Sequence, residues 1–431
     1  MEAQTPMQSA ATPPMKSQDA GKNMQRQMMA QEYDALARAK QTKTPVAYLF
    51  ISGNIQELFR SFGFLVVYPE INALQCGIKK AAGPLILKAE DKGYSSDVCG
   101  YVKNDIGLVM QNNKSPMGDL PRPDLLVCNF SGCNTYIKWF EALAELYDVP
   151  LVMLDVPYVR DGVIPKQDIA YIVSQLHDVI ATCEKVTGRS FDKAELSRVL
   201  ALSAKAEDKW CQVLETATRV PSPIDSFFEA VFFMAGINIF RGTQACVDYY
   251  DAVLAEIAER VERGVGPVER ERFRVVMEGP PPWPHFRAFW ELFKRWGVVC
   301  TAATYPKVGG LFDTGLRHDP SAPIESLANY ALNCYTNWSL DKRAELMEGY
   351  LKHFKADALV IHSVKSCRSF SVGQGDFRDL FVRGKNIPTL LVESDLADPR
   401  YFQEAQLRNR IDAFFEALEH RRLTAPVGGA L

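Results

Sequence analysis

The stretch Asp357-Ala-Leu-Val-Ile-His-Ser-Val-Lys-Ser-Cys367 predicts a buried strand followed by a loop that carries a single cysteine. Asp124-Leu-Leu-Val-Cys-Asn-Phe-Ser-Gly-Cys133 has the same layout earlier in the chain. Each unit continues into a second strand after a proline, Pro150 or Pro388. Two similar units indicate an internal repeat. Because α/β proteins gather ligands at the carboxyl ends of parallel strands, we expect two facing sheet edges to bring Cys133 and Cys367 together.

Apolar runs that are typical of strands alternate with helical segments on both sides of a long helical stretch. The runs at residues 46–51 and 65–68 open the first series, and those at 274–278 and 298–304 open the second. This alternation predicts an α/β fold with two Rossmann- or flavodoxin-like parallel-sheet units and a helical connecting subdomain. The expected organisation is a mobile N-terminal arm (1–27), a first α/β domain (28–164), the helical connecting subdomain (165–265), a second α/β domain (266–421) and a frayed tail (422–431).

The amino-acid composition excludes few classes of protein, but it limits the partners that we expect. The chain has 431 residues, of which 47% are hydrophobic and 23% charged, as expected of a globular protein with two or three domains. A net charge of −3 gives no reason to expect nucleic acid or an anionic membrane as a partner. We find no apolar run of about 20 residues and no signal peptide, so the cytoplasm is the expected location. Phosphate-binding glycine motifs are also lacking, so we expect no nucleotide on this chain.

The ten cysteines form no CxxC pair. We expect six of them to be small apolar core residues: Cys76, Cys128, Cys183, Cys211, Cys246 and Cys300. In contrast, Cys99, Cys133 and Cys367 stand in loops or at helix starts, with Cys99 expected in a first helical turn, and Cys334 is a fourth candidate. Thiolates gathered in a cleft suit an iron–sulfur cluster or zinc, and the alternative is a set of scattered structural cysteines.

Many short strings, in one order, resemble a known family. They include Pro69-Glu-Ile-Asn-Ala73, Asp97-Val-Cys-Gly-Tyr-Val-Lys103, Ser131-Gly-Cys133, Lys307-Val-Gly-Gly310, Arg317-His-Asp-Pro320 and Ser363-Val-Lys-Ser-Cys367. From about residue 30 to residue 420 the chain resembles the 2-hydroxyacyl-CoA dehydratase / benzoyl-CoA reductase superfamily. Within it, the chain is most similar to the B-type subunits of ATP-dependent (class I) benzoyl-CoA reductases.

The resemblance implies a redox function. Cys99, Cys133 and Cys367 would hold a [4Fe–4S]-type cluster, either single or part of a larger bridged cluster. The implied partners are a homologous cluster-bearing subunit (C-type), ATP-hydrolysing activator subunits and, upstream of these, ferredoxin. The implied substrate is benzoyl-CoA or a related aryl-CoA, whose ring is reduced to a cyclic diene while the thioester delocalises the first added electron. The nucleotide would then be bound on other chains.

Some roles stay open at the level of sequence. His318 is a candidate proton donor, although an ordinary loop histidine is the favoured interpretation, and Lys365 either binds substrate or is merely solvated. Three other functions compete with the reductase: a 2-hydroxyacyl-CoA dehydratase subunit, a non-catalytic scaffold subunit of such a complex, and a zinc-binding structural protein.

Overall fold

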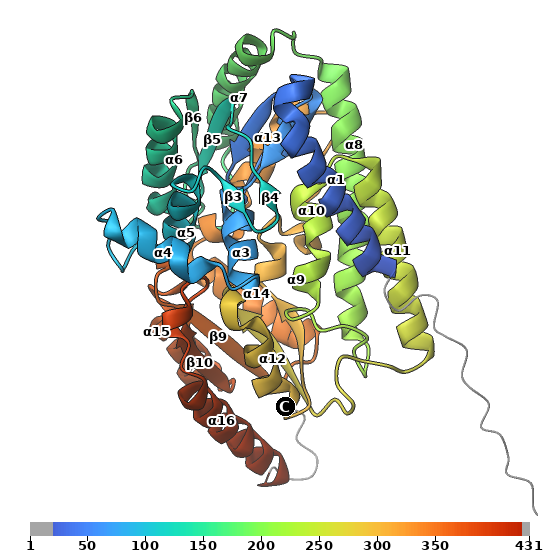
Figure 1. Cartoon of the computed structure of the whole chain (residues 1–431). Helices are drawn as coiled ribbons and strands as arrows, with labels where there is room; N and C mark the ends of the chain where they lie inside the picture. The colour runs from blue at the N-terminus through green and yellow to red at the C-terminus, as the bar shows by residue number, and fades with distance from the viewer. Residues whose placement is uncertain (1–19, 425–431) are drawn as a thin grey trace, which may run out of the picture.

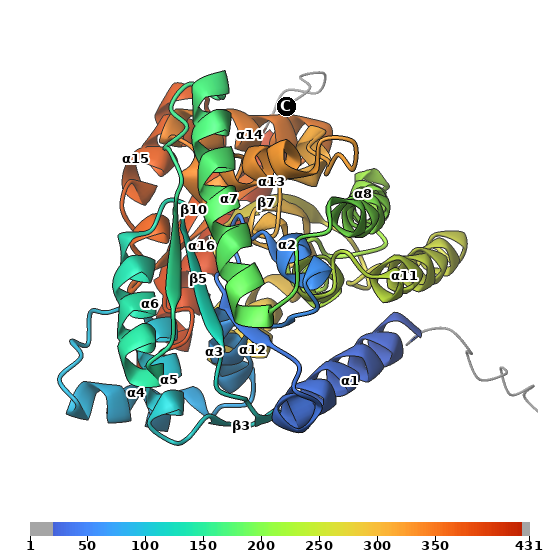
Figure 2. The same ribbon diagram turned by 90° about the horizontal axis from the view of Figure 1, so that it is seen from above.

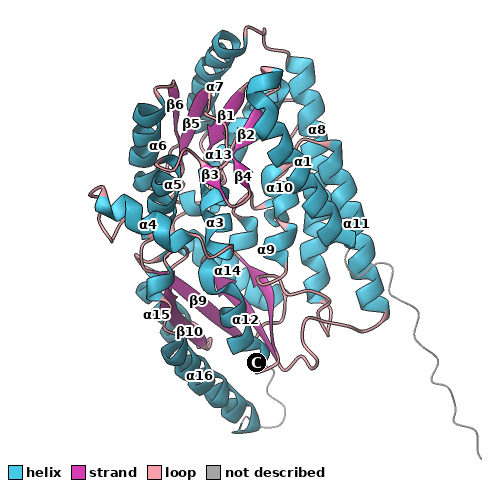
Figure 3. Cartoon of the chain, viewed as in Figure 1, coloured by secondary structure: helices cyan, strands magenta, loops and turns pink. Residues whose placement is uncertain are grey.

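Two four-stranded parallel sheets form the frame of the molecule (Figures 1 and 3). The computed structural model describes residues 20–424. The first sheet has the order β2-β1-β5-β6, with β1 (Val46–Leu49), β2 (Leu65–Val67), β5 (Leu125–Phe130) and β6 (Leu151–Asp155). The second has the order β10-β9-β7-β8, with β7 (Phe273–Glu278), β8 (Val298–Ala303), β9 (Ala358–Val364) and β10 (Thr389–Ser394). Every neighbouring pair in both sheets is parallel, which confirms the predicted fold class.

The two sheets share one topology. Numbered within its own unit, each sheet has the strand order 2-1-3-4, the third strand being β5 in one and β9 in the other. The chain winds outward in opposite directions from the first and third strands, so the crevice for a ligand lies at their carboxyl ends. Cys133 follows β5 and Cys367 follows β9. The repeat seen in the sequence therefore places equivalent cysteines at equivalent points of two sheets.

Helices from distant parts of the chain cover the first sheet. One face carries α2 (Gln56–Ser61), α7 (Lys166–Thr187) and α13 (Pro323–Leu332) in a single apolar cluster. The other face carries α3 (Pro69–Ile78), α5 (Gly100–Val109) and α6 (Asn134–Tyr147). Helix α13 lies in the segment 266–421 that we assigned to the second domain, yet it packs on the first sheet (Figure 2). The sequence boundary at residue 266 thus does not separate the two units in space.

Helices also surround the second sheet and the space between the sheets. Phe293 of α12 (Phe286–Lys294) packs with Phe415 of α16 (Glu404–Thr424), and Phe289 packs against Phe293. The remaining helices near this sheet are α14 (Leu340–His353) and α15 (Gln374–Asp379), while α4 (Ala82–Asp91) packs on α5. The connecting stretch folds into α8 (Lys193–Glu215), α9 (Ala230–Phe233), α10 (Ala235–Ile239) and α11 (Gln244–Glu262). A short antiparallel hairpin, β3 (Lys114–Ser115) and β4 (Gly118–Asp119), completes the strands of the described chain.

The N-terminal helix α1 (Ala20–Thr42) begins earlier than predicted. Its buried residues are Gly21, Met28, Leu36 and Ala39, whose spacing marks one helical face. Gly21 donates its N–H to Glu256 of α11 at 3.2 Å, and α1 lies beside α11 in both views (Figures 1 and 2). The prediction of a mobile arm is therefore wrong for residues 20–27, and its remainder, residues 1–19, lies outside the described residues.

The C-terminal end shows a smaller difference. Helix α16 runs to Thr424, so residues 422–424, which we expected to fray, are helical. Arg422 binds the carboxylate of Asp357 and donates to the carbonyl of Arg272 at 2.6 Å, which holds the last turn against the second sheet. The rest of the predicted frayed tail, residues 425–431, lies outside the described residues.

A fully buried ion pair joins the helical stretch to the first sheet. Arg241, which follows α10, donates to Glu57 of α2 at 2.5 Å, and both side chains are 0% exposed. Its other nitrogens donate to the hydroxyl of Tyr330 on α13, at 3.0 Å, and to the side-chain oxygen of Asn54, at 3.1 Å. Burial alone would raise the pKa of the Glu57 carboxyl, but the charge of Arg241, with a contribution from His318, lowers it to about 2.

Replacing this arginine is expected to destabilise the whole fold. Arg241→Met leaves the Glu57 carboxylate buried without its cation, so the free energy of unfolding should fall by about 3–5 kcal/mol in urea titrations. Arg408→Met, which breaks the exposed Arg408–Glu404 pair on α16, is the matched control and should change little. Because the pKa of Glu57 is lowered by folding, the wild-type contribution is present above about pH 4.5 and is lost as pH falls toward 2. Equal effects of both variants would contradict a special role for the buried pair.

Candidate functional site

Each of the three cysteines predicted as ligands precedes a helical turn. Cys99 is the N-cap residue of α5, Cys133 that of α6, and Cys367 that of the 3-10 turn Arg368–Phe370. Cys99 is thus one residue outside the helix in which we expected it, because α5 begins at Gly100. At such positions free N–H groups point outward and bind anions. Backbone N–H groups near each sulfur counteract the rise in the pKa of its thiol caused by burial: those of Tyr101 and Val102 at Cys99, of Thr135 and Tyr136 at Cys133, and of Ser369 and Phe370 at Cys367.

Hydrogen bonds hold the three cysteine loops together. The hydroxyl of Ser369, in the Cys367 loop, donates to the carbonyl of Gly132 at 3.0 Å. The N–H of Gly100 donates to the hydroxyl of Ser366, also at 3.0 Å. Gly132 has a φ of +85°, and a Cβ there would lie 1.9 Å from the carbonyl oxygen of Thr336, so only glycine fits. The three cysteines are 34 and 234 residues apart along the chain, and the fold joins their loops.

The three thiols lie close enough to affect one another's ionisation, and Cys133 and Cys367 are buried while Cys99 is half-buried. Burial raises the pKa of the Cys367 thiol to about 12, with a further contribution from Cys133. Burial likewise raises the pKa of Cys99 and of Cys133, and the other two thiols add to the shift at Cys99. Among residues 20–424, no three His, Cys, Asp or Glu side chains stand close enough to hold a single metal ion. The three thiols therefore lie in one region of the fold, but they are not arranged to bind one single metal ion.

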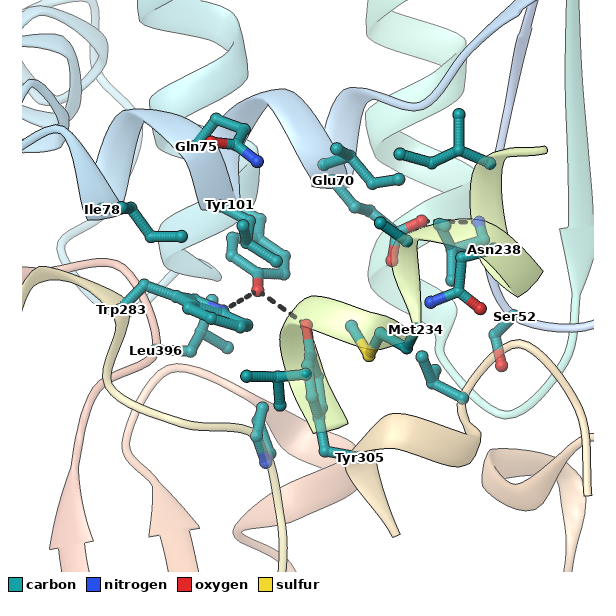
Figure 4. A pocket seen from close by; sticks show the side chains of 18 of the residues that line it. Ser52, Glu70, Gln75, Ile78, Tyr101, Met234, Asn238, Trp283, Tyr305 and Leu396 are labelled. Carbon is teal, nitrogen blue, oxygen red and sulfur yellow. Dashed lines mark hydrogen bonds between the residues drawn. The ribbon is translucent and has the colours of Figure 1, made fainter. Parts of the chain in front are cut away.

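A largely apolar cavity opens beside Cys99 and Cys367, between the two sheets and the helical stretch (Figure 4). The empty volume in and around the cavity is about 1040 Å³, and part of this volume is open solvent. Apolar side chains on its wall include Leu74, Ile78, Met234, Val308, Phe370 and Leu396. This size and lining are typical of a site for an organic ligand that is mostly apolar.

Glu70 is an ionisable residue on this apolar wall (Figure 4). It lies in the first turn of α3, and its Oε2 accepts the N–H of Ile51, two residues after β1, at 2.6 Å. Its other oxygen has no hydrogen-bond partner in the described chain. Burial raises the pKa of the Glu70 carboxyl to about 8, so it is protonated at neutral pH. Its place in Pro69-Glu-Ile-Asn-Ala73 indicates no role for it at the level of sequence.

Three hydrogen-bonded aromatic residues form another polar part of the wall. The indole N–H of Trp283 donates to the hydroxyl of Tyr101 at 2.6 Å, and this hydroxyl lies 3.2 Å from that of Tyr305 (Figure 4). All three side chains line the cavity. Tyr101 belongs to the same helical turn whose N–H groups bind Cys99. Sequence reasoning missed this group, because its members are separated by up to 204 residues.

The other candidates lie away from the cavity wall. His318 is buried, with its Nδ1 hydrogen-bonded to Glu207, and it is not among the lining residues. Lys365 is exposed, and its ammonium lies 5.0 Å from the centre of the Tyr401 ring. Cys334 is hydrogen-bonded behind the wall to Ser52, which does line the cavity. The fold thus brings Cys99, Cys133 and Cys367 together and leaves these three outside the group.

Comparison with known proteins shows the family of this chain. The family model "2-hydroxyglutaryl-CoA dehydratase, D-component" matches residues 55–418. The chain belongs to this family. It is 42% identical to the B-type subunit of benzoyl-CoA reductase from Thauera aromatica, over 98% of this chain and 100% of that protein. It is 28% identical to the alpha subunit of (R)-2-hydroxyisocaproyl-CoA dehydratase from Clostridioides difficile, over 92% of this chain and 95% of that protein.

The names of these relatives also describe subunits of larger enzymes. The chain is a homologue of the B-type benzoyl-CoA reductase subunit within a family of catalytic dehydratase and reductase subunits, and the relatives' names describe parts of multi-subunit enzymes. A solved structure titled "Nitrogenase Cp1 at pH 6.5" aligns with 90% of this chain and 63% of its own, at 11% identity, but its TM-score of 0.20 establishes no shared fold. Within residues 20–424, no helix is both long and apolar enough to cross a membrane.

Proposed function

We propose that this chain is the iron–sulfur subunit of an ATP-dependent benzoyl-CoA (aryl-CoA) reductase. The observation that carries the proposal is the convergence of the Cys99, Cys133 and Cys367 thiols beside an apolar cavity whose wall includes the buried Glu70 carboxyl. The 42% identity to a benzoyl-CoA reductase subunit along the whole chain favours this reaction over others in the family.

The donor set fits an iron–sulfur cluster better than a catalytic base or a disulfide. Two buried cysteines and one half-buried cysteine, each with backbone N–H groups near its sulfur, match the thiolate ligands of such clusters and their polar surroundings. Cys99, Cys133 and Cys367 would hold a [4Fe–4S]-type cluster, single or part of a larger bridged one. When bound, such a cluster supplies electrons one at a time at low potential. Burial and the apolar wall favour that low potential.

The cavity supplies the binding site and a proton. Its apolar wall suits the aromatic ring and excludes water, which protects a strongly reducing reaction from side reactions. The ring takes up two electrons and two protons to give a cyclic dienoyl-CoA. The electrons come from reduced ferredoxin through ATP-hydrolysing activator subunits on other chains, and the complex works in the cytoplasm, where both are supplied. The Glu70 carboxyl delivers one of the protons and regains it from solvent before the next turnover.

A dehydratase is the second candidate. The family model and several relatives at 28% identity carry dehydratase names, so the same thiols and cavity can serve the elimination of water from a 2-hydroxyacyl-CoA. A third candidate, a scaffold subunit without a cluster, predicts the same fold but no bound iron. The substrate that is turned over separates the first two candidates, and an iron count separates the third.

The test is co-expression of the complete complex without oxygen, followed by an iron count and an assay of substrate-dependent reductant oxidation with ATP. We expect bound iron and sulfide on this subunit and formation of a cyclic diene from benzoyl-CoA. Turnover of a 2-hydroxyacyl-CoA alone would support the dehydratase. Activity of the complex with no iron on this chain would support the scaffold and contradict the cluster assignment.

A further inference from the structure

One O–H of the Tyr101–Tyr305 pair has no acceptor in the described chain. Tyr101 accepts the indole N–H of Trp283 at 2.6 Å, and the two tyrosine oxygens are 3.2 Å apart. Each hydroxyl carries one hydrogen, and one of the two is used between them. Neither oxygen has another acceptor within hydrogen-bond distance among residues 20–424. Whichever tyrosine donates to the other, one O–H is left to donate elsewhere.

The remaining O–H belongs to a pair that lines the cavity. Both side chains are on its wall, and both are largely buried, Tyr101 with 7% and Tyr305 with 9% of its surface exposed. A buried donor without an acceptor costs roughly 1–3 kcal/mol, so such a group is normally satisfied by a ligand or an ordered water. The neighbouring wall groups include Cys99 and Glu70, which the proposed function assigns to electron and proton supply.

We propose that the Tyr101–Tyr305 pair donates this hydrogen bond to the thioester carbonyl oxygen of the acyl-CoA substrate, with Trp283 as a positioning residue. The inference rests on the proposed function and adds the group that recognises the acyl end of the substrate. It applies to an aryl thioester and to a 2-hydroxyacyl thioester alike, because both present the same carbonyl. The indole N–H fixes the Tyr101 oxygen, so the pair is set in place before the substrate arrives.

This arrangement favours the reaction and not only binding. When the thioester takes up an electron, negative charge develops on its carbonyl oxygen. Hydrogen bonds to a charged acceptor are stronger than those to a neutral one, so the O–H stabilises the charged species more than the bound substrate. Donors held in a dry site act in the same way in oxyanion holes, where loss of one costs about 10²- to 10³-fold in rate.

The test compares two ligands that differ only at the carbonyl. The oxygen-free complex is titrated by calorimetry with benzoyl-CoA and with S-benzyl-CoA, a thioether that has CH₂ in place of C=O. The wild type is expected to bind the thioester roughly 3- to 10-fold more tightly, as one hydrogen bond allows. The double variant Tyr101→Phe/Tyr305→Phe should lose this preference, keep its affinity for the thioether within about 2-fold, and lose about 10²- to 10³-fold in kcat.

A control variant separates the loss of carbonyl recognition from general damage to the structure. Tyr147→Phe removes a buried hydroxyl that bonds to Asn113 outside the cavity, and it should preserve the preference. A double variant that keeps the preference, or that loses affinity for both ligands equally, would overturn the carbonyl assignment while the proposed function stands. If the iron-loaded wild type binds neither ligand nor a 2-hydroxyacyl-CoA, the proposed function fails and this inference fails with it.

Discussion

Cys367→Ala is expected to remove the bound iron and with it all substrate-dependent electron uptake. The loop that carries Cys367 is bonded to each of the other two, through Ser369 to Gly132 and through Ser366 to Gly100, so Cys367 stands at the centre of the group. Loss of a group that merely supports a metal ligand costs about 10- to 100-fold, so loss of a ligand itself should reduce activity by more than about 100-fold. Iron and sulfide content, together with the visible spectrum of the purified complex, measure the first effect, and reductant oxidation measures the second.

The matched control for this prediction is Cys183→Ala. Cys183 is a fully buried cysteine of α7 in the core on the far side of the first sheet from α5 and α6, so its replacement leaves only a small cavity. It should lower the unfolding free energy by about 1 kcal/mol and leave the iron content unchanged. If Cys367→Ala keeps full iron, the assignment of this ligand is wrong. If both variants lose iron, the effect comes from general destabilisation and not from ligation.

The fold was predictable where local pattern and chain topology agree. All eight strands of the two sheets coincide with apolar runs seen in the sequence, because strands buried on both faces consist almost entirely of apolar residues. The meeting of Cys133 and Cys367 follows from the same reasoning, since each cysteine comes just after the third strand of its unit. Cys99 is a candidate because of its expected position in a first helical turn, and the structure places it one residue earlier, at the N-cap of α5.

Contacts between distant segments could not be predicted from the local sequence pattern. Glu70 and the Tyr101–Tyr305–Trp283 group come from separate elements and meet only in the folded cavity, so no spacing along the chain links them. His318 was a candidate because of its residue type, but its partner Glu207 comes from α8, a contact that the sequence did not reveal. The start of α1 was missed because its few buried residues are seven, eight and three positions apart, too sparse a stripe to stand out among polar residues.

Glu70→Gln is expected to lower kcat by roughly 10²- to 10⁴-fold while leaving the iron content and the affinity for benzoyl-CoA nearly unchanged. Glutamine has almost the same shape, and its side-chain oxygen can still accept the N–H of Ile51, but it has no acidic proton to deliver. Asp105→Asn is the matched control. Burial also raises the pKa of the Asp105 carboxyl, to about 7, but this group bonds to Trp139 and does not line the cavity. Similar losses of activity in both variants would remove Glu70 as the donor.

The pH dependence distinguishes a lost proton donor from a damaged fold. Because the Glu70 carboxyl has a pKa of about 8 in the folded protein, the wild type should lose activity as pH rises through 8, and the infrared band of the protonated carboxyl should disappear over the same range. Folding raises this pKa above the ordinary value of 4.5, so the carboxyl's contribution to stability is full below pH 4.5 and is lost as pH rises to about 8. Glu70→Gln lacks that loss, so the inactive variant should withstand alkaline pH better than the active wild type. A damaged fold would give the opposite order of stability.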